Sequence, residues 1–111
     1  MRFEETLIGN VLVAKVLDSR IAADVVPRFK TQLIDYINSA YPSIVIDMSE
    51  VSFIDSSGLS ALISGLKTVG EERNFVICGT RGSVASVFKL TRMDKVFRMY
   101  ANAQEAVAAL S

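Results

Sequence analysis

Residues 45–66 read VIDMSEVSFIDSSGLSALISGL, and they contain the junction that decides the fold. A β-branched apolar run ends at Asp47, an acidic connector follows, and a second short apolar run leads to Asp55-Ser56-Ser57-Gly58. Apolar residues then recur at helical spacing up to Gly70: Leu59, Leu62, Ile63, Leu66 and Val69. The stretch therefore predicts a buried strand, a turn, and an amphipathic helix that opens on two adjacent serines.

The N-terminal third predicts a hairpin followed by a helix. Two β-branched runs within residues 2–17 flank Gly9-Asn10, and both turn residues tolerate positive φ. Between Ala22 and Ser39 the apolar residues take helical spacing. We expect this helix to begin near Asp24, with Asp24 as its N-cap and Pro27 in its first turn.

The remaining segments continue the alternation of strands and helices. Residues 43–48 and 74–79 are nearly continuous apolar runs, which is typical of strands covered on both faces. Residues 83–90 and 103–110 predict short helices, and residues 95–100 an edge strand. The predicted order is β-β-α-β-α-β-α-β-α, an α/β fold in which helices cover a mixed central β-sheet, with residues 1–111 forming one domain.

Composition excludes several classes of function. The chain of 111 residues has 12 basic and 12 acidic side chains, so we expect no direct nucleic-acid binding. It contains no histidine, which excludes a Ser-His-Asp triad and a His-based metal site, and we expect no metal or cofactor. Its single cysteine, Cys78, lies in an apolar run and is expected to be a buried, inert thiol. With no signal-peptide core and no membrane-spanning run, we expect a cytoplasmic protein that does not insert into membranes.

Three interpretations of the paired serines stay open. Ser56 or Ser57 can simply cap the helix, which contributes about 1 kcal/mol, with Gly58 allowing close packing. A serine nucleophile lacks a histidine base, and only a pairing with Lys67, Lys89 or Lys95 remains, so we expect no enzyme. Alternatively, a serine in the first turn of a helix is a phosphorylation switch that changes binding without changing the fold.

The motif from Asp47 to Leu59 resembles the signature of anti-sigma factor antagonists in the STAS family (sulfate transporter and anti-sigma factor antagonist), and the predicted order of elements is similar to the family's fold. The resemblance implies that the unphosphorylated protein binds an anti-sigma factor with serine-kinase activity and thereby releases a sigma factor. It further implies that the kinase phosphorylates Ser57 and that a serine phosphatase resets the cycle. Asp55 would orient Ser57 or only cap the helix, and Gly58 would admit the kinase and phosphate.

The family's second contact region, a Gly-x-Leu-Asp pattern, matches less well. Residues 15–20 read KVLDSR, in which Asp18 matches the aspartate but no glycine is present at Val16 or nearby. Asp18 is therefore either a partner-binding residue or an ordinary turn residue. The departure leaves an alternative function open, a STAS module that serves as a constitutive protein-binding subunit of a transporter or a signalling scaffold.

A basic stretch near the C-terminus is not explained by the motif. Only Asp94 opposes its five cations, which are Arg81, Lys89, Arg92, Lys95 and Arg98. It is either a solvated face or a surface that meets an acidic partner.

Overall fold

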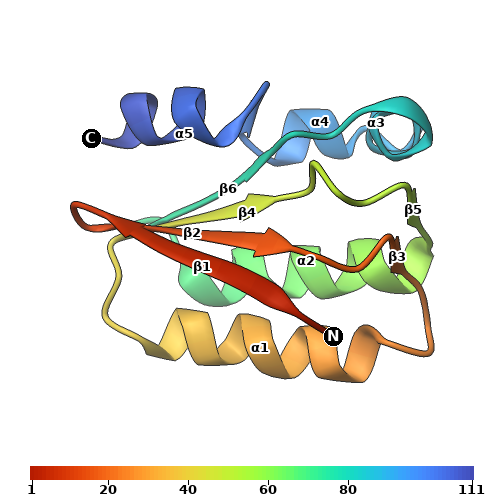
Figure 1. The fold of residues 1–111 in the computed structure, drawn as a ribbon, viewed down its shortest axis with the longest axis horizontal. Helices are drawn as coiled ribbons and strands as arrows, with labels where there is room; N and C mark the ends of the chain where they lie inside the picture. Colours follow the sequence, from red (N-terminus) through yellow and green to blue (C-terminus); the bar gives the residue numbers. More distant parts are fainter.

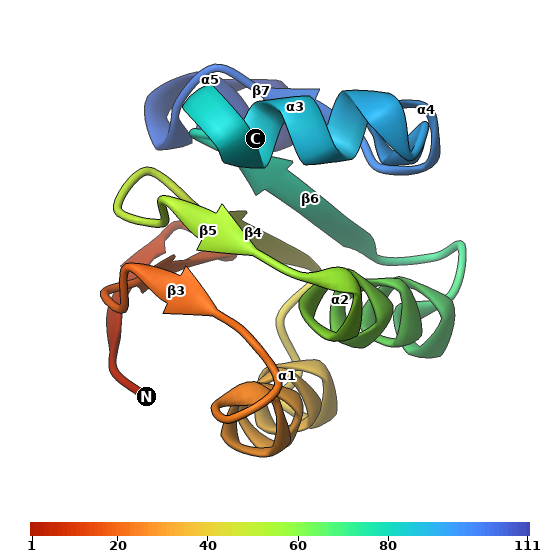
Figure 2. The same cartoon turned by 90° about the vertical axis from the view of Figure 1, so that its right-hand side faces the viewer.

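The computed structural model describes residues 1–111 and contains a five-stranded mixed sheet with helices on both faces (Figures 1 and 2). The sheet order is β1-β2-β4-β6-β7, in which only the β1–β2 pair is antiparallel. Its strands are β1 (Phe3–Ile8), β2 (Val11–Val16), β4 (Ser43–Asp47), β6 (Asn74–Cys78) and β7 (Met99–Tyr100). The helices are α1 (Val26–Asn38), α2 (Ser56–Val69), α3 (Gly82–Leu90), α4 (Met93–Val96) and α5 (Ala103–Leu110). None of these helices combines the length and the apolar character needed to cross a bilayer.

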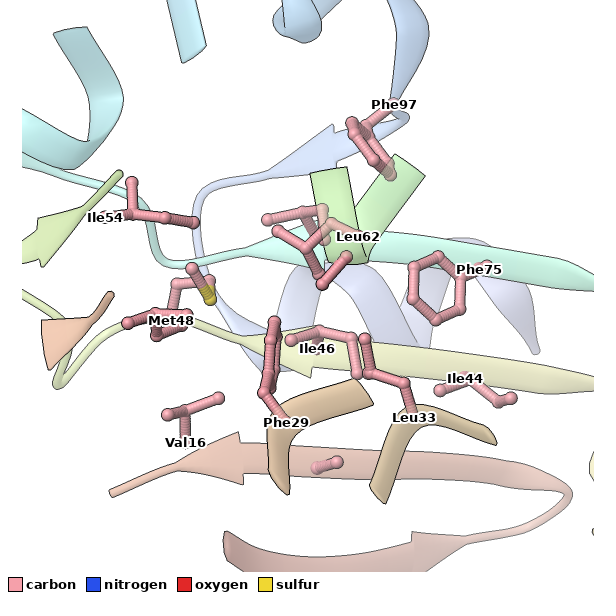
Figure 3. Packing of buried hydrophobic residues seen from close by; sticks show 14 of the residues in the cluster. Val16, Phe29, Leu33, Ile44, Ile46, Met48, Ile54, Leu62, Phe75 and Phe97 are labelled. Carbon is pink, nitrogen blue, oxygen red and sulfur yellow. The ribbon is translucent and has the colours of Figure 1, made fainter. Parts of the chain in front are cut away.

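The central strands are apolar throughout because both of their faces are covered. Alternate residues of β4, Ile44 and Ile46, enter a cluster of 23 buried residues shared with α1 and α2 (Figure 3). Val45, between them, enters a second cluster of 6 buried residues that includes Ala106 of α5. The predicted mixed sheet under helices is therefore confirmed, and so are the hairpin, the two buried strands and the helices at residues 56–69, 82–90 and 103–110.

Cys78 at the end of β6 is buried, as predicted. Burial, together with the nearby Asp47 carboxylate, raises the pKa of its thiol to about 12. At neutral pH this raised pKa keeps the thiol protonated. Because only the thiolate is reactive, Cys78 is an inert residue of the core.

The predicted N-cap of α1 is wrong. The structure places the N-cap at Val25, with no side-chain hydrogen bond to the helix end, and Asp24 is exposed. Instead, the amides of Val25 and Val26 both donate to the carbonyl of Ala22, at 2.9 and 3.1 Å. This backbone turn satisfies the first orphan amides of the helix, so no side-chain cap is needed, and Pro27 lies in the first turn as expected.

Three short elements differ from the predicted order. A separate parallel ribbon pairs β3 (Arg20–Ile21) with β5 (Phe53–Ile54), and neither strand was predicted, because two residues show no periodicity. The edge strand expected over residues 95–100 shrinks to Met99–Tyr100, and residues 93–96 form α4 instead. The reason is a reversal at Arg92, which takes a left-handed conformation at φ 61° and turns the chain into a new helix.

Arg73, before β6, ties the α1–β4 connection to the sheet. Its guanidinium donates to the carbonyls of Ile37 (2.7 Å), Ser39 (2.9 Å) and Tyr41 (2.8 and 3.0 Å). One planar group therefore satisfies three carbonyls at the C-terminal end of α1, where the helix itself offers no partner.

We expect Arg73→Lys to lower the free energy of unfolding by about 2 kcal/mol, because a single ammonium cannot reach all three carbonyls and leaves some unsatisfied. Urea unfolding measures this value. Arg28→Lys is the matched control, since Arg28 is exposed on α1, and it should change stability by less than about 0.5 kcal/mol. Equal effects of the two substitutions would contradict this role of Arg73.

Candidate functional site

The junction between β5 and α2 brings one carboxylate together with three donors. Asp55 is the N-cap of α2 and has extended backbone angles. Its Oδ1 accepts the hydroxyl of Ser57 at 2.5 Å and the amide of Gly58 at 3.0 Å. Its Oδ2 accepts the amide of Ala23 at 3.1 Å. The cap of the helix and the contact with Ser57 are thus made by the same carboxylate oxygen.

The β3–β5 ribbon explains why Ala23 reaches this site. In the parallel register Ile21 lies beside Ile54, and the amide of Asp55 donates to the carbonyl of Ile21 at 3.2 Å. The chain after β3 therefore passes alongside the start of α2, as the foreground of Figure 2 shows. Sequence reasoning missed Ala23 because it contributes a backbone amide, which no side-chain type reveals.

Hydrogen bonding holds Asp55 in its charged form. The hydroxyl of Ser57, and next the amide of Gly58, lower the pKa of the Asp55 carboxyl below its ordinary value. An ionised carboxylate only accepts hydrogen bonds, so the proton of the Ser57 hydroxyl must point toward Asp55. The lone pairs of Ser57 Oγ are then directed away from Asp55.

The two serines of the motif differ in their surroundings. Ser56 is the exposed first residue of α2, whereas Ser57 is half-buried and held by Asp55. The structure thus separates two hydroxyls that are adjacent in the sequence and that sequence reasoning treated as competitors for the cap.

Gly58 lies where the first turn of α2 packs on the ribbon. A Cβ at this position would lie 2.7 Å from Ile54 Cγ1, 2.9 Å from Ile21 Cγ2 and 3.0 Å from the carbonyl oxygen of Ile21. Gly58 is itself buried, so the missing side chain is what allows the helix to approach β3 and β5 this closely.

We therefore predict that Gly58→Ala destabilises the protein by about 1–3 kcal/mol through overpacking, although alanine normally favours a helix interior over glycine by about 1 kcal/mol. Thermal or urea unfolding measures the change. Ser60→Ala, at an exposed position two residues further along α2, is the control and should leave stability nearly unchanged or slightly increased. A stabilised Gly58→Ala variant would contradict the packing described.

Asp18 lies apart from this cluster. It precedes β3, and its Oδ1 accepts the amide of Arg2 at 2.9 Å. The β3–β5 ribbon runs from this region toward Asp55, and three residues separate Asp18 from Ala22, two of which, Arg20 and Ile21, form β3. Asp18 lies before the ribbon and Ser57 after it, and the two side chains do not share hydrogen bonds with each other.

An exposed aromatic residue on the same ribbon was not predicted. Phe53 of β5 retains 44% of its surface, and the guanidinium of Arg20 lies 5.4 Å from its ring centroid. An apolar ring stacked under a cation beside Asp55 is a feature typical of protein-binding surfaces. No group of three or more His, Cys, Asp or Glu side chains is arranged to hold a metal ion.

The lowered pKa of Asp55 predicts a pH-dependent contribution to stability. A carboxyl group whose folded-state pKa is below its unfolded value, about 3.9, stabilises the fold above that value and loses the effect as the pH falls through the folded pKa. The difference in the free energy of unfolding between wild type and Asp55→Asn should therefore be larger at pH 7 than below about pH 4. Urea titrations at both pH values measure it.

Asp24→Asn is the control for this series, because Asp24 is exposed and does not cap α1. It should show no comparable pH-dependent difference from wild type. A difference for Asp55→Asn that stays constant or grows toward low pH would show that the carboxylate form is not the one that stabilises the junction.

Comparison with protein families identifies the chain. The sequence profile of the STAS domain matches residues 7–106. The chain belongs to the STAS domain family. This confirms the resemblance inferred from the Asp-Ser-Ser-Gly motif and its flanking strand and helix.

Relatives within and around the family cover most of the chain. A candidate anti-sigma factor antagonist of Thermotoga maritima is 28% identical over 81 residues, which are 71% of this chain and 72% of that protein. The crystal structure of an anti-sigma factor antagonist from Mycobacterium paratuberculosis is 27% identical, with a TM-score of 0.89 over 97% of this chain and 92% of that one. Unphosphorylated Bacillus SpoIIAA shares the STAS fold at 16% identity, with a TM-score of 0.80 over 98% and 96% of the two chains.

Proposed function

We propose that this STAS protein is an anti-sigma factor antagonist controlled at Ser57. Its unphosphorylated form binds an anti-sigma factor that is also a serine kinase, and this binding releases a sigma factor. Phosphorylation of Ser57 ends the interaction, and a serine phosphatase restores it. The names of the relatives from Thermotoga and Mycobacterium support the class of function.

The observation that carries the proposal is the hydrogen bond from Ser57 to Asp55 in the first turn of α2. It holds one hydroxyl in a fixed direction at the end of a helix, with the lone pairs of its oxygen facing away from the carboxylate. In phosphoryl transfer from ATP, Ser57 Oγ bonds to the γ-phosphorus, the bond from that phosphorus to ADP breaks, and the Oγ proton passes to the Asp55 carboxylate that accepts its hydrogen bond. A pre-oriented oxygen favours this step, because positioning is most of what phosphoryl transfer requires.

The Asp55 carboxylate that caps α2 determines the surroundings of a phosphate on Ser57. A phosphate at a helix N-terminus is normally stabilised by free backbone amides. Here the Asp55 carboxylate already accepts the amide of Gly58, so that donor is not free for a Ser57 phosphate. The phosphate, with a charge of about −1.5 to −2, would lie beside a carboxylate.

This arrangement makes the phosphorylated surface unfavourable for binding. A partner that binds here would have to desolvate the Ser57 phosphate and the Asp55 carboxylate together, and this opposes association. A penalty of about 3 kcal/mol weakens binding roughly a hundredfold. The fold need not change, because Ser57 is only half-buried. Asp18, before the adjoining ribbon, and Phe53, on that ribbon, are further candidates for partner contact.

We predict that phosphopeptide mass spectrometry of the protein from its native cells finds phosphate on Ser57, with an occupancy that changes between growth and stress. A cognate serine kinase should modify wild type and Ser56→Ala but not Ser57→Ala, which makes Ser56→Ala the matched control. Ser57→Asp should lose most of its affinity for that kinase while its circular dichroism spectrum stays that of the wild type.

Modification that persists in Ser57→Ala would place the switch at another residue. A Ser57 that is unmodified under every condition, in a protein that nevertheless binds its partner, would favour the constitutive subunit of a transporter or scaffold. Genes beside this one separate the two cases, because a kinase or phosphatase gene accompanies the first and a transporter operon the second.

A further inference from the structure

The zero net charge of the chain conceals a strong asymmetry. Residues 73–104 contain six of the twelve basic side chains and only one of the twelve acidic ones, a net charge of +5. The other six basic and eleven acidic residues give the rest of the chain a net charge of −5. Such a separation orients a protein in an electric field even when its total charge is zero.

The most basic part of this segment forms a projecting corner. Phe88 and Phe97 are both buried, and their rings pack edge to face with centroids 6.1 Å apart. The eight residues between them, hereafter the 89–96 corner, comprise the end of α3, the turn at Thr91-Arg92 and the whole of α4, and only Met93 among them packs against the core. Six of the eight are exposed: Lys89, Leu90, Thr91, Arg92, Lys95 and Val96.

Two apolar side chains protrude among these cations. Leu90 has 83% of its surface exposed, the largest value among the exposed large hydrophobic residues, and Val96 has 50%. Each is flanked in sequence by a lysine, Lys89 and Lys95 respectively. A single exposed aliphatic side chain is ordinary, and Leu7 and Ile34 are exposed elsewhere on the chain. The 89–96 corner differs because its two exposed aliphatic side chains lie among cations, a combination typical of surfaces that contact membranes.

The corner is held rigidly. Arg92 is the one non-glycine residue with a left-handed backbone, at φ 61°. Its amide donates to the carbonyl of Lys89 at 3.2 Å, and the hydroxyl of Thr91 donates to the carbonyl of Val87 at 2.6 Å. A bulky residue in this conformation carries strain, which is retained where the surrounding structure requires the turn.

These features fit a lipid surface better than a globular partner. A stable protein interface buries about 800 Å² on each side and relies on aromatic or arginine anchors in pockets, which two aliphatic side chains at a turn do not provide. A lipid headgroup layer, in contrast, deforms around a protruding apolar side chain and attracts each nearby cation. A purely solvated basic face would need no exposed Leu90.

We propose that the 89–96 corner docks on membranes that contain anionic phospholipids. Leu90 and Val96 enter the headgroup layer, and Lys89, Arg92 and Lys95 bind the lipid phosphates. Asp94 is the one acidic residue of the corner. The net −5 charge of the rest of the chain disfavours other orientations. The corner and α1 lie on opposite sides of the sheet (Figure 1), so α1 would face away from the membrane.

The test is co-sedimentation of the full chain with vesicles of phosphatidylcholine alone or with about 30% phosphatidylglycerol added. Binding should require the anionic lipid and should largely disappear between about 0.1 and 1 M salt, where the Debye length falls from about 10 to 3 Å. Lys89→Glu should lower the partition coefficient about twentyfold, because the reversal removes one attraction and adds one repulsion. Leu90→Ser should lower it about tenfold by removing the inserted side chain.

Lys30→Glu is the matched control, because it makes the same change in net charge at an exposed position on α1. It should alter the partition coefficient less than about threefold. No binding to the anionic vesicles, or equal losses in Lys30→Glu and Lys89→Glu, would overturn the proposal. Binding to soluble polyglutamate but not to vesicles would also overturn it and assign the corner to an acidic protein.

The proposal does not rest on the role of Ser57. Ser57→Ala should bind the vesicles as wild type does, so vesicle binding and kinase modification succeed or fail separately.

Discussion

The carboxylate of Asp55 is the interaction on which the candidate site depends. It accepts three hydrogen bonds, one from the amide of Ala23 after β3 and two from the first turn of α2, the Ser57 hydroxyl and the Gly58 amide. A neutral side chain could cap the helix, but only an ionised acceptor forces the serine proton toward itself. The position of α2, the path of the chain after β3 and the direction of the Ser57 oxygen are thus coupled through one group.

The close packing beneath that carboxylate makes the coupling rigid. Gly58 brings α2 against Ile21 and Ile54 with no room for a side chain, so the ribbon and the helix cannot shift independently. A two-residue ribbon would be marginal on its own. It persists because buried Ile21 and Ile54 belong to the main core, and this anchoring keeps the exposed Phe53 and Arg20 beside the site.

The sequence predicts the parts of this protein that have periodicity and misses those that depend on tertiary contacts. The apolar runs of β4 and β6 and the stripe of α2 were sufficient for the sheet and the helix, whereas the choice of Ser57 over Ser56 came from the resemblance to the anti-sigma factor antagonists. Aspartate is a favoured N-cap residue, but in α1 the first amides instead donate to the backbone carbonyl of Ala22, so Asp24 does not cap the helix. The β3–β5 ribbon and the amide of Ala23 carry no side-chain signature, and the reversal at Arg92 contradicts the β-propensity of the residues that follow it.

The net charge of this chain is a poor guide to its function, because the basic and acidic residues are unevenly distributed along the sequence. A net charge of zero argued against nucleic-acid binding, but it also conceals +5 on residues 73–104 and −5 on the rest. Phosphorylation of Ser57 would add about −1.5 to −2 to the acidic part alone. That change falls at the start of α2, whereas the 89–96 corner belongs to the end of α3 and to α4. One small domain can in this way carry a switched protein contact and an unswitched lipid contact on different elements of the same fold.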